Sequence, residues 1–428
     1  MSVHRGRPVA LVFGPSVRAL RNPNFRLFIS GQGVSQVGMW MQQTAELWLI
    51  LQLTGSGTAL GLHSVMRFGP VMLFGAYAGV FSDRIDRRRL LIATQSVLAV
   101  AAATLTVTAM LTTPSVLVIY GVVLVQGLVN AVDNPLRRGF VRDLVTDDEL
   151  TNGVSLNSSV MTLSRTVGPA LGGLVIAGFG AVPCFAINTI SYAAVLMSLI
   201  RVDPTALRPS TPVRRAAGQV RAGLRYAWSH ADIRSTLIMI AIASAFAWNW
   251  ATILPVYAGT ALSGGASLYG LLASVLGVGA FLGGLATTRI TTVRAHHLVL
   301  FPGLIAVAML ISAVSVPLPV VMGGLMLLGA ASTAFAVACQ TRIQLATDDA
   351  MSGRVLALYS VGFVGSKPVG GVLAGWVIDA IGPRGAFAVN AVAMTVLTIA
   401  AAVAYLRPRA QVDVTSGSSS RAPRRRGR

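Results

Sequence analysis

Charged residues are scarce in this 428-residue sequence, at 11% of the total against 54% apolar residues. A soluble domain usually has about a quarter of its residues charged, so this scarcity excludes an ordinary soluble fold. Cysteine is also rare. We expect the two cysteines on opposite sides of a membrane, Cys184 at the outer end of one apolar span and Cys339 at the inner end of another. They are then too far apart to form a disulfide.

Residue patterns that mark enzymes are missing as well. The sequence has no Walker-type Gly-Lys-Ser or Gly-Lys-Thr loop, so we expect no ATP hydrolysis by this chain. His296 and His297 form a loop pair without further metal ligands beside them. We therefore predict no enzymatic activity, no cofactor and no bound metal.

Long apolar runs are what the sequence has instead. Each contains roughly the 20 residues that an α-helix needs to cross the hydrocarbon core of a bilayer, whereas soluble helices would show amphipathic periods. We predict an all-α polytopic membrane protein with twelve transmembrane helices, at 25–51, 58–80, 90–112, 115–135, 152–178, 180–200, 235–260, 267–288, 297–316, 318–340, 354–379 and 385–406.

Basic residues alternate between the gaps that separate these spans. Of the 34 Lys and Arg, all but four lie before or at the start of the first span, after the last span, or in or at the edge of every second loop. The exceptions are Arg384 in an opposite loop, and Arg67, Arg165 and Lys367 within spans. Because Arg-rich loops stay in the cytoplasm during insertion, we predict a bacterial inner-membrane protein with both termini cytoplasmic. We expect its basic face to contact anionic lipid headgroups rather than nucleic acid.

The sequence reads as two copies of one six-span unit. Trp40 and Trp248 occupy corresponding places in the two copies, and so do Arg165 and Lys367. Two parallel repeats imply a pseudo-two-fold axis along the membrane normal, with the substrate path between the halves. We predict five regions: a cytoplasmic N-terminal segment (1–24), an N-terminal six-helix bundle (25–200), a cytoplasmic linker with an amphipathic helix (201–234), a C-terminal six-helix bundle (235–406) and a basic disordered cytoplasmic tail (407–428).

The segment 79–91, between the second and third spans, resembles the signature G-x-L-A-D-R-x-G-R-R-x-x-L of the major facilitator superfamily, with Asp86 in place of the second Gly. This resemblance covers nearly the whole chain and implies the major facilitator fold. It also implies that the loop latches the two halves together on the cytoplasmic side in the outward-open state. The alternative is a basic turn that only fixes topology. The expected latch residues are Gly79, Asp83, Arg84, Arg87 and Arg88.

A second motif lies in the fifth span. The segment 164–173 is similar to the G-x-x-x-G-P-x-x-G-G signature of drug:proton antiporters, with Ser164 in place of the first Gly. Small residues and a Pro let a helix bend and approach a neighbour closely, so ordinary packing is the alternative reading. Within the superfamily, the chain most resembles the branch of the enterobactin exporter and macrolide-efflux proteins, although Val123 stands where such antiporters often have an Arg. The motif residues are Gly168, Pro169, Gly172 and Gly173.

Ionisable residues at membrane depth are costly and usually functional. Glu46 is the only carboxylate well inside a predicted span, and Arg67 on the next span lies within roughly 6 Å of its depth at 1.5 Å per residue. A carboxylate that gains and loses a cationic partner can bind and release a proton, but a static buried pair is the alternative. Asp133, at a predicted span end, is the next proton-coupling candidate. We expect His63 to be a hydrogen-bonded residue near the interface.

A positively charged, aromatic interior is predicted between the halves. Arg165 and Lys367 favour anionic or acceptor-rich substrates, unless they only satisfy helix carbonyls. Aromatic faces beside polar groups suit bulky amphipathic ligands; Trp48 and Tyr257, nearer the outer boundary, are expected in an interfacial belt instead. The other cavity candidates are Trp40, Trp248 and Asn249.

These patterns predict a secondary active transporter that exports an amphipathic small molecule, drug-like or siderophore-like and of anionic character, by alternating access and proton antiport. We expect it to act as a monomer. The alternatives are an importer, a uniporter or a lysolipid flippase on the same scaffold, or a transporter-like receptor that no longer transports.

Overall fold

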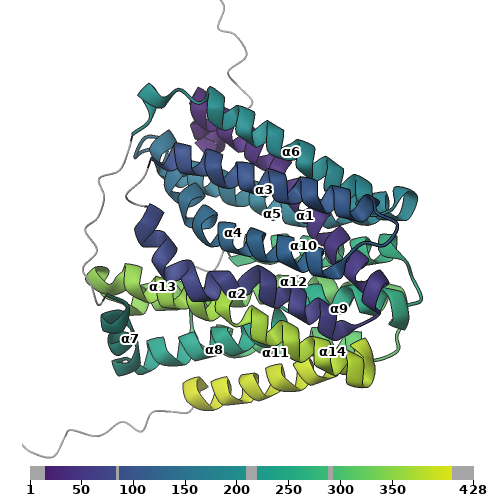
Figure 1. Ribbon diagram of the computed structural model, residues 1–428. Helices are drawn as coiled ribbons and strands as arrows, with labels where there is room; N and C mark the ends of the chain where they lie inside the picture. The colour runs from purple at the N-terminus through teal and green to yellow at the C-terminus, as the bar shows by residue number, and fades with distance from the viewer. Residues whose placement is uncertain (1–14, 83–85, 209–218, 288–292, 407–428) are drawn as a thin grey trace, which may run out of the picture.

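The computed structural model describes residues 15–82, 86–208, 219–287 and 293–406. Within these ranges the chain is helical, and the helices form two bundles that are stacked one above the other in Figure 1. After a short 3₁₀ turn at Pro15–Arg21, the N-terminal bundle contains α1 (Pro23–Thr54), α2 (Gly57–Ser82), α3 (Arg87–Met110), α4 (Val116–Leu144), α5 (Leu150–Phe179) and α6 (Val182–Arg201).

The C-terminal bundle follows a linker that holds a 3₁₀ turn at Pro204–Ala206 and α7 (Gln219–Ser229). Leu224 and Trp228 of α7 are exposed, whereas Ala227 is buried. The bundle contains α8 (Ala231–Ala247), α9 (Trp250–Val256), a π-helical turn (Tyr257–Ala261), α10 (Ala266–Thr287), α11 (Ala295–Ala313), α12 (Leu318–Ala346), α13 (Asp349–Gly365) and α14 (Lys367–Leu406).

Two passes of the C-terminal bundle are interrupted, which the apolar runs did not predict. The seventh pass, expected as one helix, breaks at Trp248 and Asn249 between α8 and α9 and then turns π-helical. The eleventh pass is interrupted at Ser366, where α13 ends and α14 begins. The boundary between the eleventh and twelfth passes lies inside α14, at Gly382, with φ of 79°, and Pro383. A positive φ is readily adopted only by glycine.

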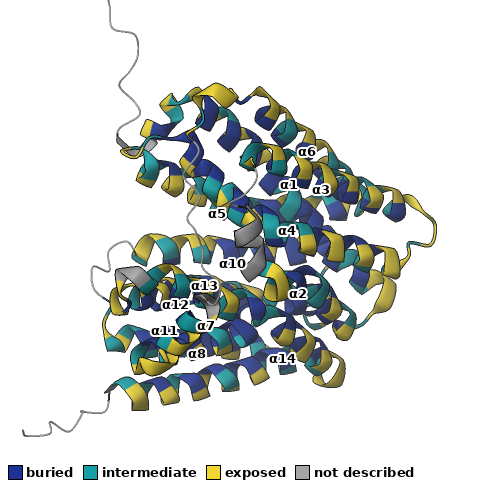
Figure 2. Ribbon diagram, turned by 60° about the vertical axis from the view of Figure 1, so that its left-hand side comes forward, coloured by how far each residue is buried: buried dark blue, intermediate teal, exposed yellow. Residues whose placement is uncertain are grey.

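Nine helical stretches of the described chain are long and apolar enough to cross a membrane, and the last of them, Met351–Tyr405, contains the eleventh and twelfth passes. The remaining two passes are α1 and α2. Polar residues such as Gln32, Gln36 and Gln43 are buried along α1, which lowers the hydropathy of this helix. Figure 2 shows exposed residues on the outward faces of the helices, and many of these are large and apolar, including Val100, Leu117 and Trp376. Such a surface suits lipid rather than water.

The two bundles pack against each other chiefly through α2 with α14 and α5 with α10. Glycines bring these helices together at the end of the molecule that carries the α1–α2 turn. A methyl group added at Gly61 would lie 2.6 Å from the carbonyl oxygen of Gly371, and one at Gly173 would lie 2.6 Å from Gly270 Cα. Close backbone approach of this kind requires small residues. This end of the molecule, which we name the closed end, therefore has no room for a substrate between these helices.

Candidate transport site

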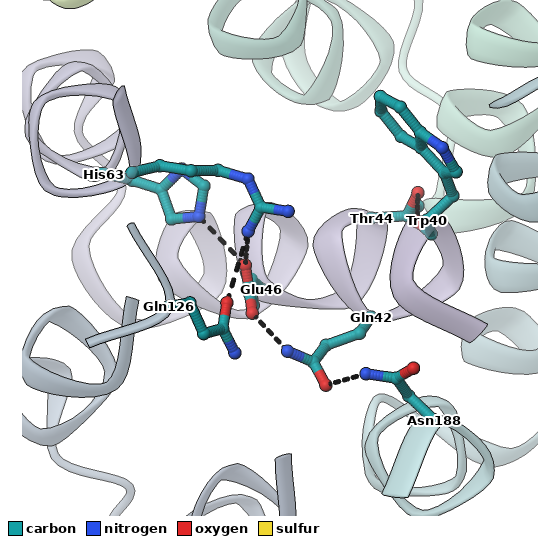
Figure 3. A network of polar contacts seen from close by, with 8 residues as sticks. Trp40, Gln42, Thr44, Glu46, His63, Gln126 and Asn188 are labelled. Atoms are coloured by element: carbon teal, nitrogen blue, oxygen red, sulfur yellow. Dashed lines mark hydrogen bonds and ion pairs between the residues drawn. The ribbon is translucent and has the colours of Figure 1, made fainter. Parts of the chain in front are cut away.

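Glu46 lies at the centre of a polar network inside the N-terminal bundle. It is fully buried on α1, and both oxygens of its carboxylate have partners. Oε2 lies 3.0 Å from His63 Nε2 and 3.4 Å from Arg67 Nη1, and Oε1 accepts a hydrogen bond of 2.7 Å from Gln42 Nε2. Figure 3 shows the carboxylate of Glu46 between His63 and Gln42. One acid thus lies between two groups of α2 that can carry positive charge.

The partners of Glu46 are themselves held by other helices. Arg67 Nη1 also donates to Gln126 Oε1 on α4, at 3.3 Å, and Asn188 Nδ2 on α6 donates to Gln42 Oε1, at 2.5 Å. All of these side chains are at least nine-tenths buried. The network therefore links four helices of one bundle, and a change of charge at Glu46 affects the contacts of all four.

The structure brings together the predicted pair of Glu46 and Arg67 but corrects the position of His63. His63 was expected near the interface, yet it is 2% exposed and approaches Glu46 more closely than Arg67 does. Its ring lies against Glu46 of α1 inside the N-terminal bundle, which a hydropathy pattern does not show. A signal was present in the sequence, because His63 and Arg67 are four residues apart and so share one helix face.

Asp133, the second acid considered for coupling, is also placed differently from the expectation. The predicted span ended near it, whereas α4 continues to Leu144 and buries Asp133 completely. Its carboxylate accepts hydrogen bonds from Thr94 Oγ1 (2.7 Å) and Gln95 Nε2 (2.8 Å), and it forms an ion pair with Arg137 one turn later. This acid has a full set of partners on α3 and α4.

The residues of the expected latch are only partly visible. Asp83 and Arg84 lie outside the described residues, and Gly79 belongs to the last turn of α2. Arg87 Nη1 makes two contacts with the Asp143 carboxylate, at 2.8 and 3.0 Å, and Arg88 donates to the carbonyl oxygens of Leu199 and Ile200 at the end of α6. These partners of Arg87 and Arg88 belong to the N-terminal bundle.

The small residues of α5 let it approach two helices at once. A methyl group at Gly168 would overlap Trp40 Cβ, and one at Gly172 would lie 3.2 Å from Met41 Cα, so both face α1. Gly173 faces α10 across the bundle interface, and the carbonyl oxygen of Pro169 is also close to Gly270. The motif thus lies where α5 meets α1 of its own bundle and α10 of the other bundle.

Aromatic rings lie beside Arg165 and Lys367, which form no ion pair with any residue that the structure describes. The Arg165 guanidinium lies 5.5 Å from the centre of the Trp40 ring and 5.7 Å from that of Trp250, while Lys367 Nζ lies 5.0 Å from Phe68 and 4.9 Å from Phe363. These distances fit cation–π contacts. A crevice beside Arg165 is lined by Trp248, Trp250, Leu276, Ala280, Leu328, Gly329, Ser332 and Thr333.

Asn249, expected in the cavity, and Tyr257 both lie in packed surroundings. Asn249 is 5% exposed, and its amide is used in packing: it donates to the Ala245 carbonyl oxygen and accepts from Asn390 Nδ2 at 3.0 Å. Tyr257, expected in an interfacial belt, is fully buried with its ring edge-on to Phe387. Trp250, which neighbours Asn249 in the sequence, supplies the second ring to Arg165. Trp250 is the first residue of α9, directly after the helix break at Trp248 and Asn249. The periodicity of the sequence does not indicate that break.

Comparison with known proteins agrees with this architecture. A family model described as "Transmembrane secretion effector" matches residues 15–425. A staphyloferrin A transporter of Staphylococcus aureus is 26% identical over 62% of this chain and 67% of its own length. Macrolide efflux protein A of Streptococcus pyogenes is 26% identical over 40% of this chain, which spans less than half of that protein. The enterobactin exporter EntS of Shigella flexneri is 23% identical over 83% of this chain and 85% of its own length.

Solved structures share the fold. The nucleoside transporter NupG superposes with a TM-score of 0.74 at 11% identity, over 90% of this chain and all of NupG. A bacterial homologue of the lysosomal transporter Spinster, in an inward-facing and unoccupied conformation, superposes with a TM-score of 0.65 at 12% identity, over 91% and 96% of the two chains. The predicted all-α fold of twelve transmembrane helices in two bundles is thus confirmed. The chain belongs to the transmembrane secretion effector family of the major facilitator superfamily and is a membrane transporter with a non-enzymatic role.

Proposed function

We propose that this transporter exports an amphipathic small molecule by alternating access and exchanges it for protons at Glu46. The observation that carries the proposal is the position of the Glu46 carboxylate, fully buried and in contact with His63 and Arg67 of α2. A buried carboxylate in such surroundings can change its charge only together with its partners. The relatives named as macrolide and enterobactin exporters support the outward direction.

The helix that carries the partners of Glu46 also carries contacts between the bundles. His63 and Arg67 lie on α2 between Gly61, which packs on Gly371, and Phe68, whose ring contacts Lys367. A proton on Glu46 weakens its attraction to Arg67 and so loosens α2 from α1. The balance between the two access states then depends on the charge of Glu46. Protonation of Glu46 can thus affect the contacts between the two bundles, which must separate for the access state to change.

We infer the placement in the membrane from the charges of the loops. The transporter lies in a bacterial inner membrane as a monomer, with segments 1–24, 201–234 and 407–428 in the cytoplasm beside anionic headgroups, and with bundles at 25–200 and 235–406. The closed end then faces outward. A cysteine at the exposed Thr113 should react with an impermeant reagent from outside intact cells, and one at the exposed Asp147 should not.

Everted membrane vesicles test the transport proposal. We expect an imposed proton gradient, acidic inside, to drive uptake of at least one of three probes, namely staphyloferrin A, enterobactin and a macrolide, with an uncoupler abolishing uptake. Glu46→Gln should lose gradient-driven accumulation but retain downhill exchange. Coupling free energies between linked sites are typically about 1–3 kcal/mol, or about 5–150-fold. If Glu46→Gln accumulated the probe to the level of the parent, Glu46 would not be the coupling residue. If no probe moved in response to the gradient, the proposed function would be wrong.

A further inference from the structure

Arg165 and Lys367 are two cations inside the transporter, one in each bundle. Both are half-buried, and among the residues that the structure describes neither forms an ion pair with a carboxylate. Arg67, by contrast, pairs with Glu46. A charge at membrane depth is costly and usually faces a partner or a water-filled path. The aromatic rings beside Arg165 and Lys367 give attraction but no opposite charge.

The two cations face the seam from opposite bundles. Arg165 belongs to α5 of the N-terminal bundle and Lys367 to the start of α14 in the C-terminal bundle, at corresponding positions of the repeat. Arg165 contacts the ring of Trp250 of α9, and Lys367 contacts the ring of Phe68 of α2, so each cation touches an aromatic side chain of the opposite bundle. Trp248 connects their surroundings, because it lines the crevice beside Arg165 and packs edge-on against Phe363, the ring that Lys367 contacts.

An unused hydroxyl lies in the same crevice. Ser332 is 6% exposed, and its Oγ has no hydrogen-bond partner among the described residues. Buried polar atoms are normally paired, so an orphan beside a cation indicates a group that is supplied from outside. A hydroxyl can donate to an anionic oxygen. The crevice thus offers charge, a donor and aromatic surface together.

We propose that Arg165 and Lys367 form a two-point recognition site for an amphiphile that carries two anionic groups. Trp40, Trp248 and Trp250 hold its apolar part, and Ser332 donates a hydrogen bond beside Arg165. The inference rests on the proposed function, since it names the substrate class of the same transporter. A ligand that contacts both cations touches both bundles, so its binding is coupled to the movement of one bundle against the other.

Three dyes with one xanthene ring system separate charge from shape. Fluorescein carries two negative charges at mildly alkaline pH, its methyl ester carries one, and rhodamine 6G carries one positive charge. Binding to the purified full-length protein in nanodiscs can be measured by fluorescence polarisation. We expect the parent to bind fluorescein roughly tenfold more tightly than the methyl ester, as one extra charge-assisted contact implies, and to bind rhodamine 6G more weakly than either.

Substitutions then assign the preference to the two cations. Arg165→Gln and Lys367→Gln should each reduce the preference for fluorescein over its ester to about onefold, whereas Lys367→Arg and Arg165→Lys should keep it. Arg221→Gln, which removes an exposed arginine of α7, is the matched control and should bind all three dyes as the parent does.

Three results would overturn the recognition site. These are no binding of fluorescein to the parent, no preference over the ester, or an equal loss of all three dyes in the Gln variants, which indicates a structural role instead. The dyes are read at equilibrium without a proton gradient. A failure of coupling at Glu46 therefore leaves this measurement unaffected, and the two proposals fail separately.

Discussion

The two bundles share a frame but differ in the chemistry of their interiors. The offset that relates Trp40 to Trp248 places Leu254 opposite Glu46, and the offset that relates Asn188 to Asn390 places Leu328 opposite Gln126. Both leucines are buried, at 0% and 1% exposure. The C-terminal bundle thus has buried leucines at the positions where the N-terminal bundle has Glu46 and Gln126.

One element of the network is common to both bundles. Asn188 donates to Gln42 in the first bundle and Asn390 donates to Asn249 in the second. In the first, the connection continues to the carboxylate of Glu46. In the second, Asn249 donates to the carbonyl oxygen of Ala245 beside the break between α8 and α9. The shared asparagines therefore belong to the packing common to both bundles, whereas the buried acid Glu46 lies in the first bundle and the broken pass in the second.

The largest effect on stability is expected from removing the cation of the N-terminal network. Arg67→Leu removes the guanidinium that donates to Gln126 Oε1 and pairs with Glu46. Breaking a buried pair from one side costs about 3–5 kcal/mol. The double variant with Glu46→Leu should recover much of this loss. Unfolding in mixed micelles with increasing SDS measures the difference.

Leu254→Met is the matched control in the C-terminal bundle. A volume-conserving apolar substitution costs less than about 1.5 kcal/mol. If Arg67→Leu cost no more than Leu254→Met, the two interiors would not differ in the way that their contacts indicate.

A bulky residue between the bundles should act on the access state. The Cβ of Gly173→Val meets the backbone of Gly270, which cannot turn aside as a side chain can. Overpacking costs about 1–3 kcal/mol, and here separation of the bundles at the closed end relieves it. Spin labels at Thr113→Cys and Gly265→Cys lie on opposite bundles. The distance between them, measured by double electron–electron resonance, should be longer in Gly173→Val than in the protein with Gly173.

Gly178→Val is the control in the same helix, because a methyl group there meets no atom within 4 Å. A distance distribution of Gly173→Val that matches the distribution of Gly178→Val would show that this contact does not hold the end closed.

The shared asparagines give a direct test of the comparison. Asn188→Ala and Asn390→Ala each remove a buried donor and should each destabilise the protein by about 1–2 kcal/mol. Asn188→Ala alone frees Gln42, the residue that binds Glu46 Oε1. We therefore expect it to reduce gradient-driven transport more than Asn390→Ala does, at equal membrane abundance. Equal transport by the two variants would contradict an asymmetric role.

The sequence predicted the passes and the family well, because hydropathy and loop charge depend on residues close together in the chain. The contact of Glu46 with Arg67 was predictable for the same reason, since a short turn joins α1 to α2. Three features were not. His63 is buried against Glu46, Trp250 contacts Arg165 beside a helix break, and α4 extends beyond Asp133. Each depends on how the helices end and pack, which the hydropathy of a single sequence does not record.

The smallest predicted effect concerns a cap that one bundle supplies to a helix of the other. Asp379 of α14 accepts hydrogen bonds from the backbone N–H groups of Gly57 (2.6 Å) and Thr58 (2.9 Å) and from Ser56 Oγ (2.8 Å). A carboxylate at the N-terminus of a helix satisfies free N–H groups and complements the helix dipole. The cap exists only while the closed end stays closed.

Asp379→Ala should therefore weaken the closed conformation by about 1 kcal/mol, which changes the ratio of the two access states about fivefold. Ser56→Ala removes one of the three hydrogen bonds and should shift the ratio less. The same spin-label pair at Thr113→Cys and Gly265→Cys reports the ratio, and Asp147→Ala, which removes an exposed acid at the other end of the N-terminal bundle, serves as the control. If Asp379→Ala and Asp147→Ala gave the same distances, the cap would stabilise only α2 itself. The closed end would then be held by the glycine contacts, and Asp379 would not contribute to the difference between the two access states.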